Sequence, residues 1–254
     1  MDLKIKHFVI FITFIIIGSC RQPNSTLIKI DAEQLPISAE IPAVDSIDRF
    51  VAPYRNRIDE VLDSTLAYAP RTISKEDGER NSSAGNLMAD IVLAQAAPIF
   101  KSRTGKELDF VLLNFGGIRS TISAGKVSAR TMYEVMPFEN NIVVAELPAS
   151  AVRKLVSFLI SASKPHPISG IQIVLDQGDS LSSVNIQGKP FDENRTYYVA
   201  TSNYLISGGD KMDFFGENVG LTDTDYLIRN AMIDYLNKVD TIAPVVDERF
   251  MKLK

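Results

Sequence analysis

Thr196-Tyr-Tyr-Val-Ala-Thr-Ser-Asn-Tyr-Leu-Ile-Ser-Gly-Gly-Asp-Lys-Met-Asp-Phe-Phe215 is a strand pattern that runs directly into a loop of unusual chemistry. Its aromatic and β-branched start predicts a buried strand that ends near Ala200. The loop then presents a ring (Tyr204), two glycines (Gly208 and Gly209) and a carboxylate (Asp210). Because glycine has no Cβ, this backbone can adopt unusual φ/ψ angles and let a ligand approach closely. The combination suits a ligand that is flat on one side and hydroxylated on the other, but taken alone a tight turn with solvated side chains explains it better.

A second glycine pair follows a second predicted strand. Residues 108–113 are apolar enough for a buried strand, and Asn114-Phe-Gly-Gly-Ile-Arg119 comes directly after it. Arg119 offers a planar fork of donors suited to carboxylate or phosphate, and Asn114 offers both an amide donor and an acceptor. A glycine-rich hairpin with a surface arginine is the alternative. Two glycine-pair loops with flanking polar groups in one chain favour a binding site over two unrelated turns.

The rest of the sequence mixes helical and strand patterns without strict alternation. Phe138 follows Pro137 and therefore sits on a constrained turn, where a core ring is commoner than a ligand platform. Pro53 must bend the first predicted helix or lie in its first turn. We expect an α+β fold, a single domain with mixed β-sheets flanked by helices, rather than a doubly wound sheet. Apolar periodicity predicts helices over 46–62, 83–97, 128–135, 148–160 and 223–236, and further strands over 141–147, 171–175 and 181–186.

Composition limits the class of protein. The chain has 254 residues, of which 45% are hydrophobic and 23% charged, as in an ordinary globular protein. A domain of roughly 200 residues is large enough to bury a core without disulfides or metals. The formal net charge of −4 argues against a nucleic-acid-binding surface, which needs a basic patch.

The N-terminus has the pattern of a targeting signal. Lys4 and Lys6 precede an apolar run of ten residues, too short to cross a bilayer but typical of a signal peptide. The run ends in Ile17-Gly-Ser-Cys20, which resembles the cleavage box of bacterial lipoproteins, although an ordinary secretory signal is the alternative. We expect a signal peptide over 1–19, lipid on Cys20, a flexible tether over 20–45 and a folded domain over 46–254. The expected location is the bacterial cell envelope, on a periplasm-facing or outer membrane. With one cysteine in the sequence, an internal disulfide is excluded.

Four motifs, taken together, resemble one known family. They are Gly85-Asn-Leu-Met-Ala-Asp90, Asn114-Phe-Gly-Gly-Ile-Arg119, Met136-Pro-Phe138 and Ser202-Asn-Tyr-Leu-Ile-Ser-Gly-Gly-Asp210. Their order and spacing are similar to those of the C-terminal, substrate-binding domain of the 5′-nucleotidase / UDP-sugar hydrolase family, over roughly residues 47–250. Each motif alone is weak, but four in register are specific.

The resemblance implies a role for individual side chains. Phe138 and Tyr204 would hold a nucleobase between their rings, and Asp210 would bind the ribose hydroxyls beside Gly208 and Gly209. Asn114 and Arg119 would contact the base and the phosphate, respectively. Further phosphate-binding arginines are implied upstream of Gly85, for which Arg80 is the candidate. Tyr204 stands where phenylalanine is common, and Lys211-Met-Asp213 replaces small or aromatic residues.

The resemblance also implies a missing part. Enzymes of this family carry an N-terminal metallophosphoesterase domain whose two divalent metal ions are held by His, Asp and Asn and activate a water. This sequence has two histidines, His7 in the expected signal peptide and His166 in a Lys-Pro-His-Pro segment that predicts a solvated surface loop. We therefore expect no metal or other cofactor in this chain. The favoured hypothesis is the nucleotide- or nucleoside-binding half of a split 5′-nucleotidase, with a separate metallophosphoesterase chain as partner.

Two alternatives to a split enzyme remain open at this point. The chain is a solitary, non-catalytic lipoprotein that binds nucleosides or nucleotides, or it is a scaffold whose site has been lost. Retention of Asn114, Arg119, Phe138, Tyr204 and Asp210 together argues against a lost site.

Overall fold

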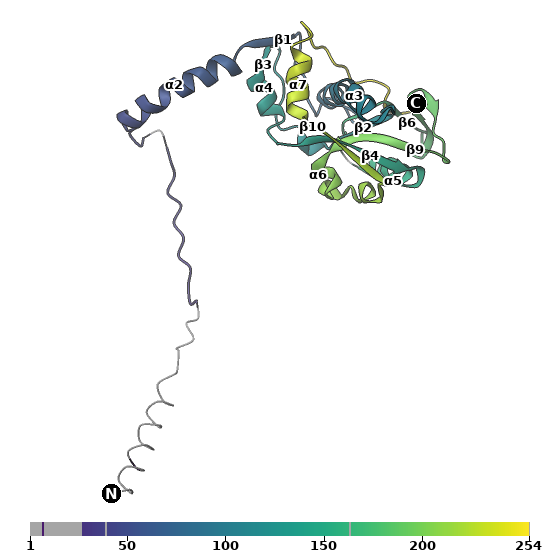
Figure 1. Ribbon diagram of the computed structural model, residues 1–254, viewed down its shortest axis with the longest axis horizontal. Coiled ribbons are helices and arrows are strands. Elements are labelled where there is room, and N and C mark those ends of the chain that lie inside the picture. The colour runs from purple at the N-terminus through teal and green to yellow at the C-terminus, as the bar shows by residue number, and fades with distance from the viewer. Residues whose placement is uncertain (1–6, 8–26, 39, 163, 254) are drawn as a thin grey trace. The chain divides into compact units, whose positions relative to one another are not determined.

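The computed structural model describes residues 7, 27–38, 40–162 and 164–253 (Figure 1). Cys20 and, except for His7, the expected signal peptide lie outside these residues. The chain divides into two compact units, Met1–Phe50 and Val51–Lys254. Residues 27–38 and 40–44 contain no helix or strand, and their side chains are exposed. Within the described ranges, no helix is both long enough and apolar enough to cross a membrane.

Two sheets and a short ribbon make up the second unit. The five-stranded sheet has the order β10-β4-β9-β2-β5, and only its β2–β9 pair is parallel. A four-stranded sheet has the order β11-β6-β7-β8, and β1 (Thr65–Ala69) pairs with β3 (Gly125–Ser128). The mixed pairing confirms the predicted α+β fold. The strands of the first sheet are β2 (Phe110–Leu112), β4 (Asn141–Pro148), β5 (Ile168–Ser169), β9 (Thr196–Ser202) and β10 (Gly220–Leu227), and those of the second are β6 (Ile171–Leu175), β7 (Leu181–Ile186), β8 (Lys189–Pro190) and β11 (Phe250–Lys252).

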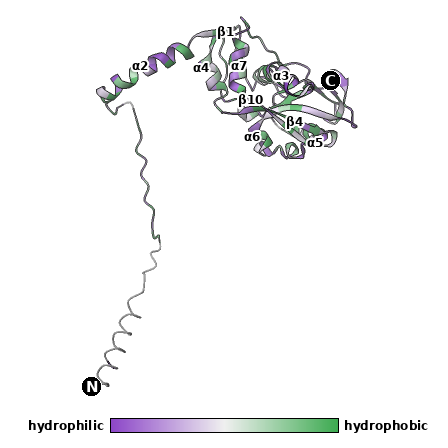
Figure 2. Cartoon of the chain, viewed as in Figure 1, coloured by the Kyte–Doolittle hydropathy of each residue, from purple (hydrophilic) through white to green (hydrophobic). Residues whose placement is uncertain are grey.

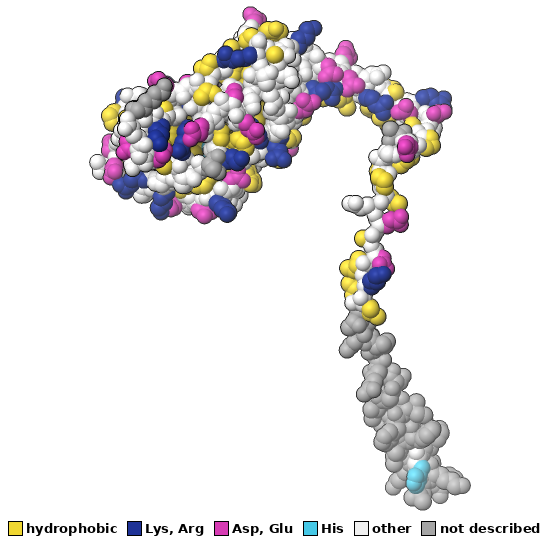
Figure 3. Space-filling model, turned by 180° about the vertical axis from the view of Figure 1, so that it is seen from behind, with side chains coloured by type: hydrophobic (Ala, Val, Ile, Leu, Met, Phe, Trp, Pro, Cys, Tyr) yellow, Lys and Arg dark blue, Asp and Glu magenta, His cyan; other side chains and the backbone are white. Residues whose placement is uncertain are grey.

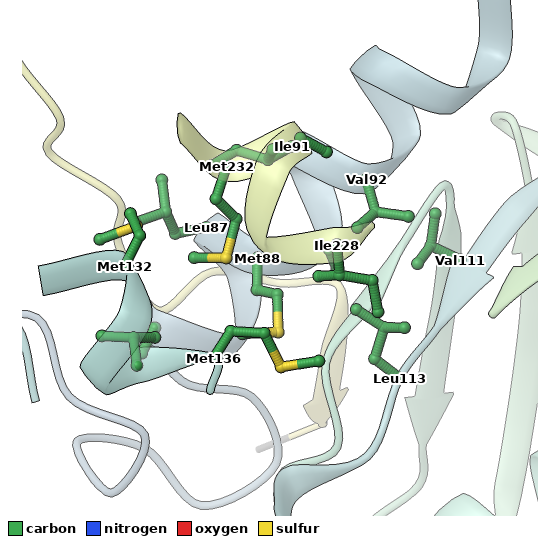
Figure 4. Close-up of a cluster of buried hydrophobic side chains, with 14 of the residues drawn as sticks. Leu87, Met88, Ile91, Val92, Val111, Leu113, Met132, Met136, Ile228 and Met232 are labelled. Carbon is green, nitrogen blue, oxygen red and sulfur yellow. The ribbon is translucent and has the colours of Figure 1, made fainter. Parts of the chain in front are cut away.

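The five-stranded sheet has a hydrophobic core on each face. Because successive side chains of a strand point to opposite sides, each central strand contributes to both cores. On β2, Val111 contributes to one hydrophobic core, and Phe110 and Leu112 contribute to the other. The first core includes residues of α3 (Ser83–Thr104), α4 (Ala129–Val135) and α7 (Ile228–Leu236), whose side chains meet beside β2 (Figure 4). The second includes α5 (Ala149–Ser161), and Figure 1 shows α3 and α5 on opposite sides of β4 and β9.

Two helix predictions were wrong at one end. The helix predicted over 83–97 continues through Pro98 to Thr104, because Phe100 is buried and Gly105 caps the end with a left-handed φ of 73°. The helix predicted over 223–236 begins only at Ile228. Residues 220–227 form β10 instead, because they pair with the edge of β4.

Helix α2 (Asp45–Leu62) forms where the sequence predicts it, with Pro53 inside it. Its residues alternate between hydrophobic and hydrophilic, as Figure 2 shows, yet none of its side chains is buried. From α4, Arg130 forms ion pairs of 2.6 Å with Asp59 and 2.5 Å with Asp63. The apolar stripe of α2 therefore takes no part in the core of the described fold.

Candidate functional site

The topology of the five-stranded sheet brings three loops to one edge. Strands β2 and β9 are parallel neighbours, so their carboxyl ends lie at the same edge of the sheet. Strand β4 is antiparallel to β9, so its first residue lies at that edge too. Asn114 follows β2, Tyr204 follows β9, and Asn140 directly precedes β4. Residues far apart in sequence thus converge without any unusual chain path.

These loops enclose a cavity of about 260 Å³. Its apolar walls are the rings of Phe138 and Tyr204, which keep 40% and 44% of their surface exposed. No aliphatic side chain lines it among the residues that the structure describes. The lining residues are Asn114, Gly116, Gly117, Arg119, Phe138, Asn140, Tyr204 and Asp210.

Asp210 is held by hydrogen bonds from two loops. Asn114 Nδ2 donates to one carboxylate oxygen at 2.7 Å, and the Tyr204 hydroxyl donates to the other at 3.0 Å. The hydrogen bond to Asp210 raises the pKa of the Tyr204 hydroxyl above its ordinary value. Each carboxylate oxygen has further lone-pair directions, so the fixed carboxylate can accept hydroxyl groups of a ligand.

Gly208 and Gly209 lie behind the Tyr204 wall of the cavity. A Cβ on Gly209 would lie 2.4 Å from Cε1 of the Tyr204 ring, so this ring packs directly on bare backbone. Gly208 has a φ of 88°, in the left-handed region that favours glycine. Neither Gly208 nor Gly209 lines the cavity. The structure therefore gives them a role in placing Tyr204, in contrast to the close ligand approach expected from the sequence.

Arg119 lines the cavity, and the residue is exposed. Its Nη1 donates to the Gly116 carbonyl at 3.3 Å, and its guanidinium carbon is 5.8 Å from the centroid of the Phe138 ring. Its main-chain N–H donates to the Val135 carbonyl at 2.8 Å, which fixes the backbone beneath the side chain. This geometry leaves N–H groups for an anionic ligand.

Arg80 is a predicted site residue whose side chain lies away from this cavity. Its Nη1 donates to the Ile160 carbonyl at 3.1 Å, and its Nη2 pairs with Asp179 at 3.3 Å. The guanidinium also lies 5.5 Å from the centroid of the Phe250 ring. The side chain is therefore engaged elsewhere on the fold and does not line this cavity.

The expectation of a solvated His166 was also wrong. The side chain is 9% exposed, and its ring centroid lies 5.4 Å from that of Phe158. Nδ1 accepts the Phe115 main-chain N–H at 3.3 Å, so the ring supports the loop that carries Asn114. Burial lowers the pKa of His166, against the opposing influences of the Asp210 charge and a hydrogen bond to the Leu113 backbone. The two flanking prolines suggested a surface loop and gave no sign of this packing.

Three lining residues were missing from the sequence prediction. Gly116 and Gly117 are part of the motif that carries Asn114 and Arg119, and a Cβ on Gly117 would lie 2.9 Å from Asn114 Oδ1. Asn140 lies between the Pro137–Phe138 turn and β4. A half-buried polar residue just before a strand is too common to single out from sequence.

The described residues offer no cluster of metal-ligating side chains. No group of three or more His, Cys, Asp or Glu side chains that could hold a metal ion occurs in residues 7, 27–38, 40–162 and 164–253. The donors in this part of the chain do not fit a dimetal centre, and we assign no step through one to it.

Sequence comparison finds relatives that align with most of this chain. The protein UshA of Yersinia enterocolitica is 25% identical over 211 residues, which are 82% of this chain and 37% of UshA. A 5′-nucleotidase of Vibrio vulnificus is 25% identical over 219 residues, with the same two coverages of 82% and 37%. This chain thus spans well under half the length of these relatives.

The fold is similar to that of solved 5′-nucleotidase structures. The 5′-nucleotidase precursor of Thermus thermophilus superimposes with a TM-score of 0.67 and 23% identity, over 82% of this chain and 43% of that one. The sequence model of the 5′-nucleotidase C-terminal domain matches residues 61–217, more than half of the chain. On this match, the chain belongs to the family of 5′-nucleotidase C-terminal domains.

Proposed function

We propose that the cavity binds a nucleotide or nucleoside, with its base between Phe138 and Tyr204 and its ribose hydroxyls on Asp210. The observation that carries this proposal is that both half-exposed rings and the doubly hydrogen-bonded carboxylate line one cavity. Base–aromatic stacking contributes roughly 1–3 kcal/mol per base. Arg119 at the same cavity suits the phosphate of a nucleotide.

Titration calorimetry with AMP and adenosine tests this proposal directly. On protein comprising residues 21–254, we expect heat of binding and quenching of tyrosine fluorescence for both ligands. Related ligands without a base, such as ribose 5-phosphate, should bind much more weakly because they cannot stack. Absence of binding up to about millimolar ligand, the weak end of specific affinities, would count against an intact cavity.

We further propose that this domain is one half of a split 5′-nucleotidase. A separate metallophosphoesterase chain would supply the two divalent metal ions and the hydrolytic chemistry in nucleotide catabolism. The domain described here would contribute positioning of the substrate. One observation supports the division: the described residues contain no group of His, Cys, Asp or Glu side chains that could hold a metal ion.

A phosphatase assay of this chain with and without the metallophosphoesterase encoded by a neighbouring gene separates the two functions that remain. The split enzyme requires that AMP hydrolysis depend on both chains. The alternative, a solitary lipoprotein that binds nucleosides without catalysis, requires that the two chains together be no more active than the metallophosphoesterase alone. Tyr204→Ala in this chain should abolish any gain.

The proposed location is the cell envelope of a bacterium, by a lipid on Cys20. The proposed partners are accordingly a membrane, a nucleotide and the second chain, and no nucleic acid. Figure 3 shows acidic and basic side chains interspersed on the displayed face of the described residues, in keeping with a formal net charge of −4. Labelled palmitate should enter the wild-type chain but not Cys20→Ala, and equal labelling would contradict the lipid anchor.

A further inference from the structure

Phe138 stands on a turn rather than in the hydrophobic core. The five residues from Met136 to Asn140 connect α4 to β4 without helix or strand, and Phe138 keeps 40% of its surface exposed. The ring belongs to neither buried cluster. The position of the Phe138 ring therefore depends on the backbone of the turn from Met136 to Asn140.

One buried arginine contacts this turn along most of its length. Arg229, the second residue of α7, has a side chain that is only 4% exposed. Its Nη1 lies 3.4, 3.1 and 3.4 Å from the carbonyl oxygens of Met136, Pro137 and Phe138. Its Nη2 pairs with the carboxylate of Glu139. A single guanidinium thus contacts four consecutive residues of the turn.

Both ends of the same turn are held as well, one by the backbone of α7 and the other by packing in the core. The main-chain N–H of Ile228 donates to the Asn140 carbonyl at 3.0 Å. Met136 and Ile228 are 2% and 1% exposed, and both lie in the cluster drawn in Figure 4. The turn is therefore anchored in the core at one end and to the start of α7 at the other. Arg229 occupies the space between these anchors.

A contribution to the stability of the core is a poor explanation for the burial of Arg229. Burying a guanidinium costs free energy unless it is paired, and its partner Glu139 is 73% exposed. Within the described residues Arg229 Nε has no hydrogen-bond partner, and the flat face of the guanidinium lies 4.2 Å from the Tyr133 ring centroid. An apolar side chain of similar volume would often be as stable at such a site. What an apolar side chain cannot do is donate to several carbonyl oxygens of a turn.

We infer that Arg229 is a positioning residue of the binding cavity, which holds the Met136–Asn140 turn so that Phe138 presents its ring to the ligand. The inference rests on the proposed nucleotide binding for its consequence, but the control of the ring by Arg229 is a property of the chain alone. It adds to the site a residue that never touches the ligand. Arg229 acts on affinity only through Phe138.

The absence of tryptophan from the sequence allows a ligand-free test. Phe138→Trp introduces the sole indole at the turn, and its time-resolved fluorescence anisotropy reports how freely the ring moves. Arg229→Lys keeps the charge and Arg229→Met keeps the bulk, but neither keeps the planar fork. In either, the indole should move more freely. Unchanged anisotropy in both would overturn the inference.

Arg249 provides the matched control. Its side chain is 15% exposed, pairs with Asp90 and Asp247, and donates to the Ile168 carbonyl at 2.8 Å. Like Arg229 it is a largely buried arginine that binds a carbonyl and a carboxylate, but it does not line the cavity or contact the turn. Arg249→Lys should leave the anisotropy of the indole unchanged. A comparable increase in Arg249→Lys would show that general loosening of the fold is enough, and would overturn the inference.

A double-mutant cycle then measures the effect on binding. Arg229→Lys should weaken AMP affinity about tenfold, within the range expected for loss of one stacking contact. In a Phe138→Ala background the same substitution should have no further effect, because the side chain through which it acts is gone. An equal loss in both backgrounds would overturn the inference. If the wild-type chain binds no AMP, the proposed function fails while the anisotropy test still decides the role of Arg229.

Discussion

Tyr204 combines two contributions in one side chain. Its ring forms a wall of the cavity, and its hydroxyl donates to Asp210 at 3.0 Å. Asp210 has a φ of 53°, a left-handed conformation that costs a residue other than glycine roughly 1–3 kcal/mol. The hydrogen bonds from Tyr204 and Asn114 hold the carboxylate that this backbone presents. Stacking and placement of the carboxylate can therefore be separated by substitution.

We predict that Tyr204→Ala weakens AMP binding more than Asp210→Asn does, because it removes both contributions. Loss of the stacking contact alone corresponds to about 1–3 kcal/mol, or roughly fivefold to 150-fold in affinity. Tyr204→Phe keeps the ring and should lie between wild type and Tyr204→Ala. Calorimetry on the three variants gives the order. If Asp210→Asn proves the weaker binder, the ribose contact outweighs stacking and this ranking is wrong.

His166 predicts how stability depends on pH. Burial lowers its pKa below the ordinary value near 6.5. The unfolded chain therefore binds a proton at a higher pH than the folded chain does. The stability of the fold with neutral, buried His166 is fully present above about pH 6.5. It is lost as the pH falls through the pKa of His166 in the folded state. We expect the free energy of unfolding, measured in urea, to fall between pH 7 and pH 5.

His166→Asn isolates this contribution from that of the carboxylates, because an amide has a comparable acceptor near the position of Nδ1 but does not titrate. The free energy of unfolding of the variant should fall less steeply over the same interval. Equal slopes in the two proteins would mean that protonation of His166 does not drive the loss.

Among the elements, α3 depends on its first turn. Ser82 is buried, and its hydroxyl oxygen accepts the Gly85 main-chain N–H at 3.2 Å, which satisfies a donor that the helix itself cannot. We predict that Ser82→Ala destabilises the domain by about 1 kcal/mol. Ser157→Ala, at an exposed position inside α5, should change the free energy of unfolding by less than about 0.5 kcal/mol. Equal midpoints in urea for the two variants would contradict the role of the cap.

Elements whose pattern is local could be predicted from the sequence, and those defined by a distant partner could not. Strands β6 and β7 form over the predicted residues 171–175 and 181–186, because alternation and the intervening turn are local signals. Strand β10 was predicted as the start of a helix. Its strand character comes from pairing with β4, whose residues lie far back in the sequence. Intrinsic preference does not contain such information.

The same division applies to the candidate site. Asn114, Arg119, Phe138, Tyr204 and Asp210 could be proposed because each lies in a motif that contains glycine or proline and resembles a motif of a known family. The roles of His166 and Arg229 could not be predicted, because each role depends on a main-chain group that lies far away in the sequence. Arg229 contacts a carbonyl 91 positions away, and His166 contacts an N–H 51 positions away. Supporting residues of a site are visible only once the chain is folded.

At the scale of the whole molecule, the apolar side chains of α2 are exposed. Ile58 and Val61 are 54% and 51% exposed, beside Tyr133 of α4 at 42%. The ion pairs from Arg130 to Asp59 and Asp63 lie at the surface, where salt and water screen them. The hydrogen bond to Arg130 holds the pKa of Asp63 below its usual value. These contacts orient α2 without placing it in the core.

We therefore predict that residues 61–254 fold as stably as residues 21–254. Hydrophobic stabilisation scales with the apolar surface removed from water, and α2 has no buried side chain to contribute. Deleting residues 21–60 should change the free energy of unfolding by less than about a tenth of the roughly 5–15 kcal/mol typical of a domain. AMP affinity should be unchanged, because the residues that line the cavity run from Asn114 to Asp210. Urea unfolding and calorimetry on the two proteins decide the matter: a loss of several kcal/mol would mean that the α2 stripe is buried in solution, contrary to the exposure described here.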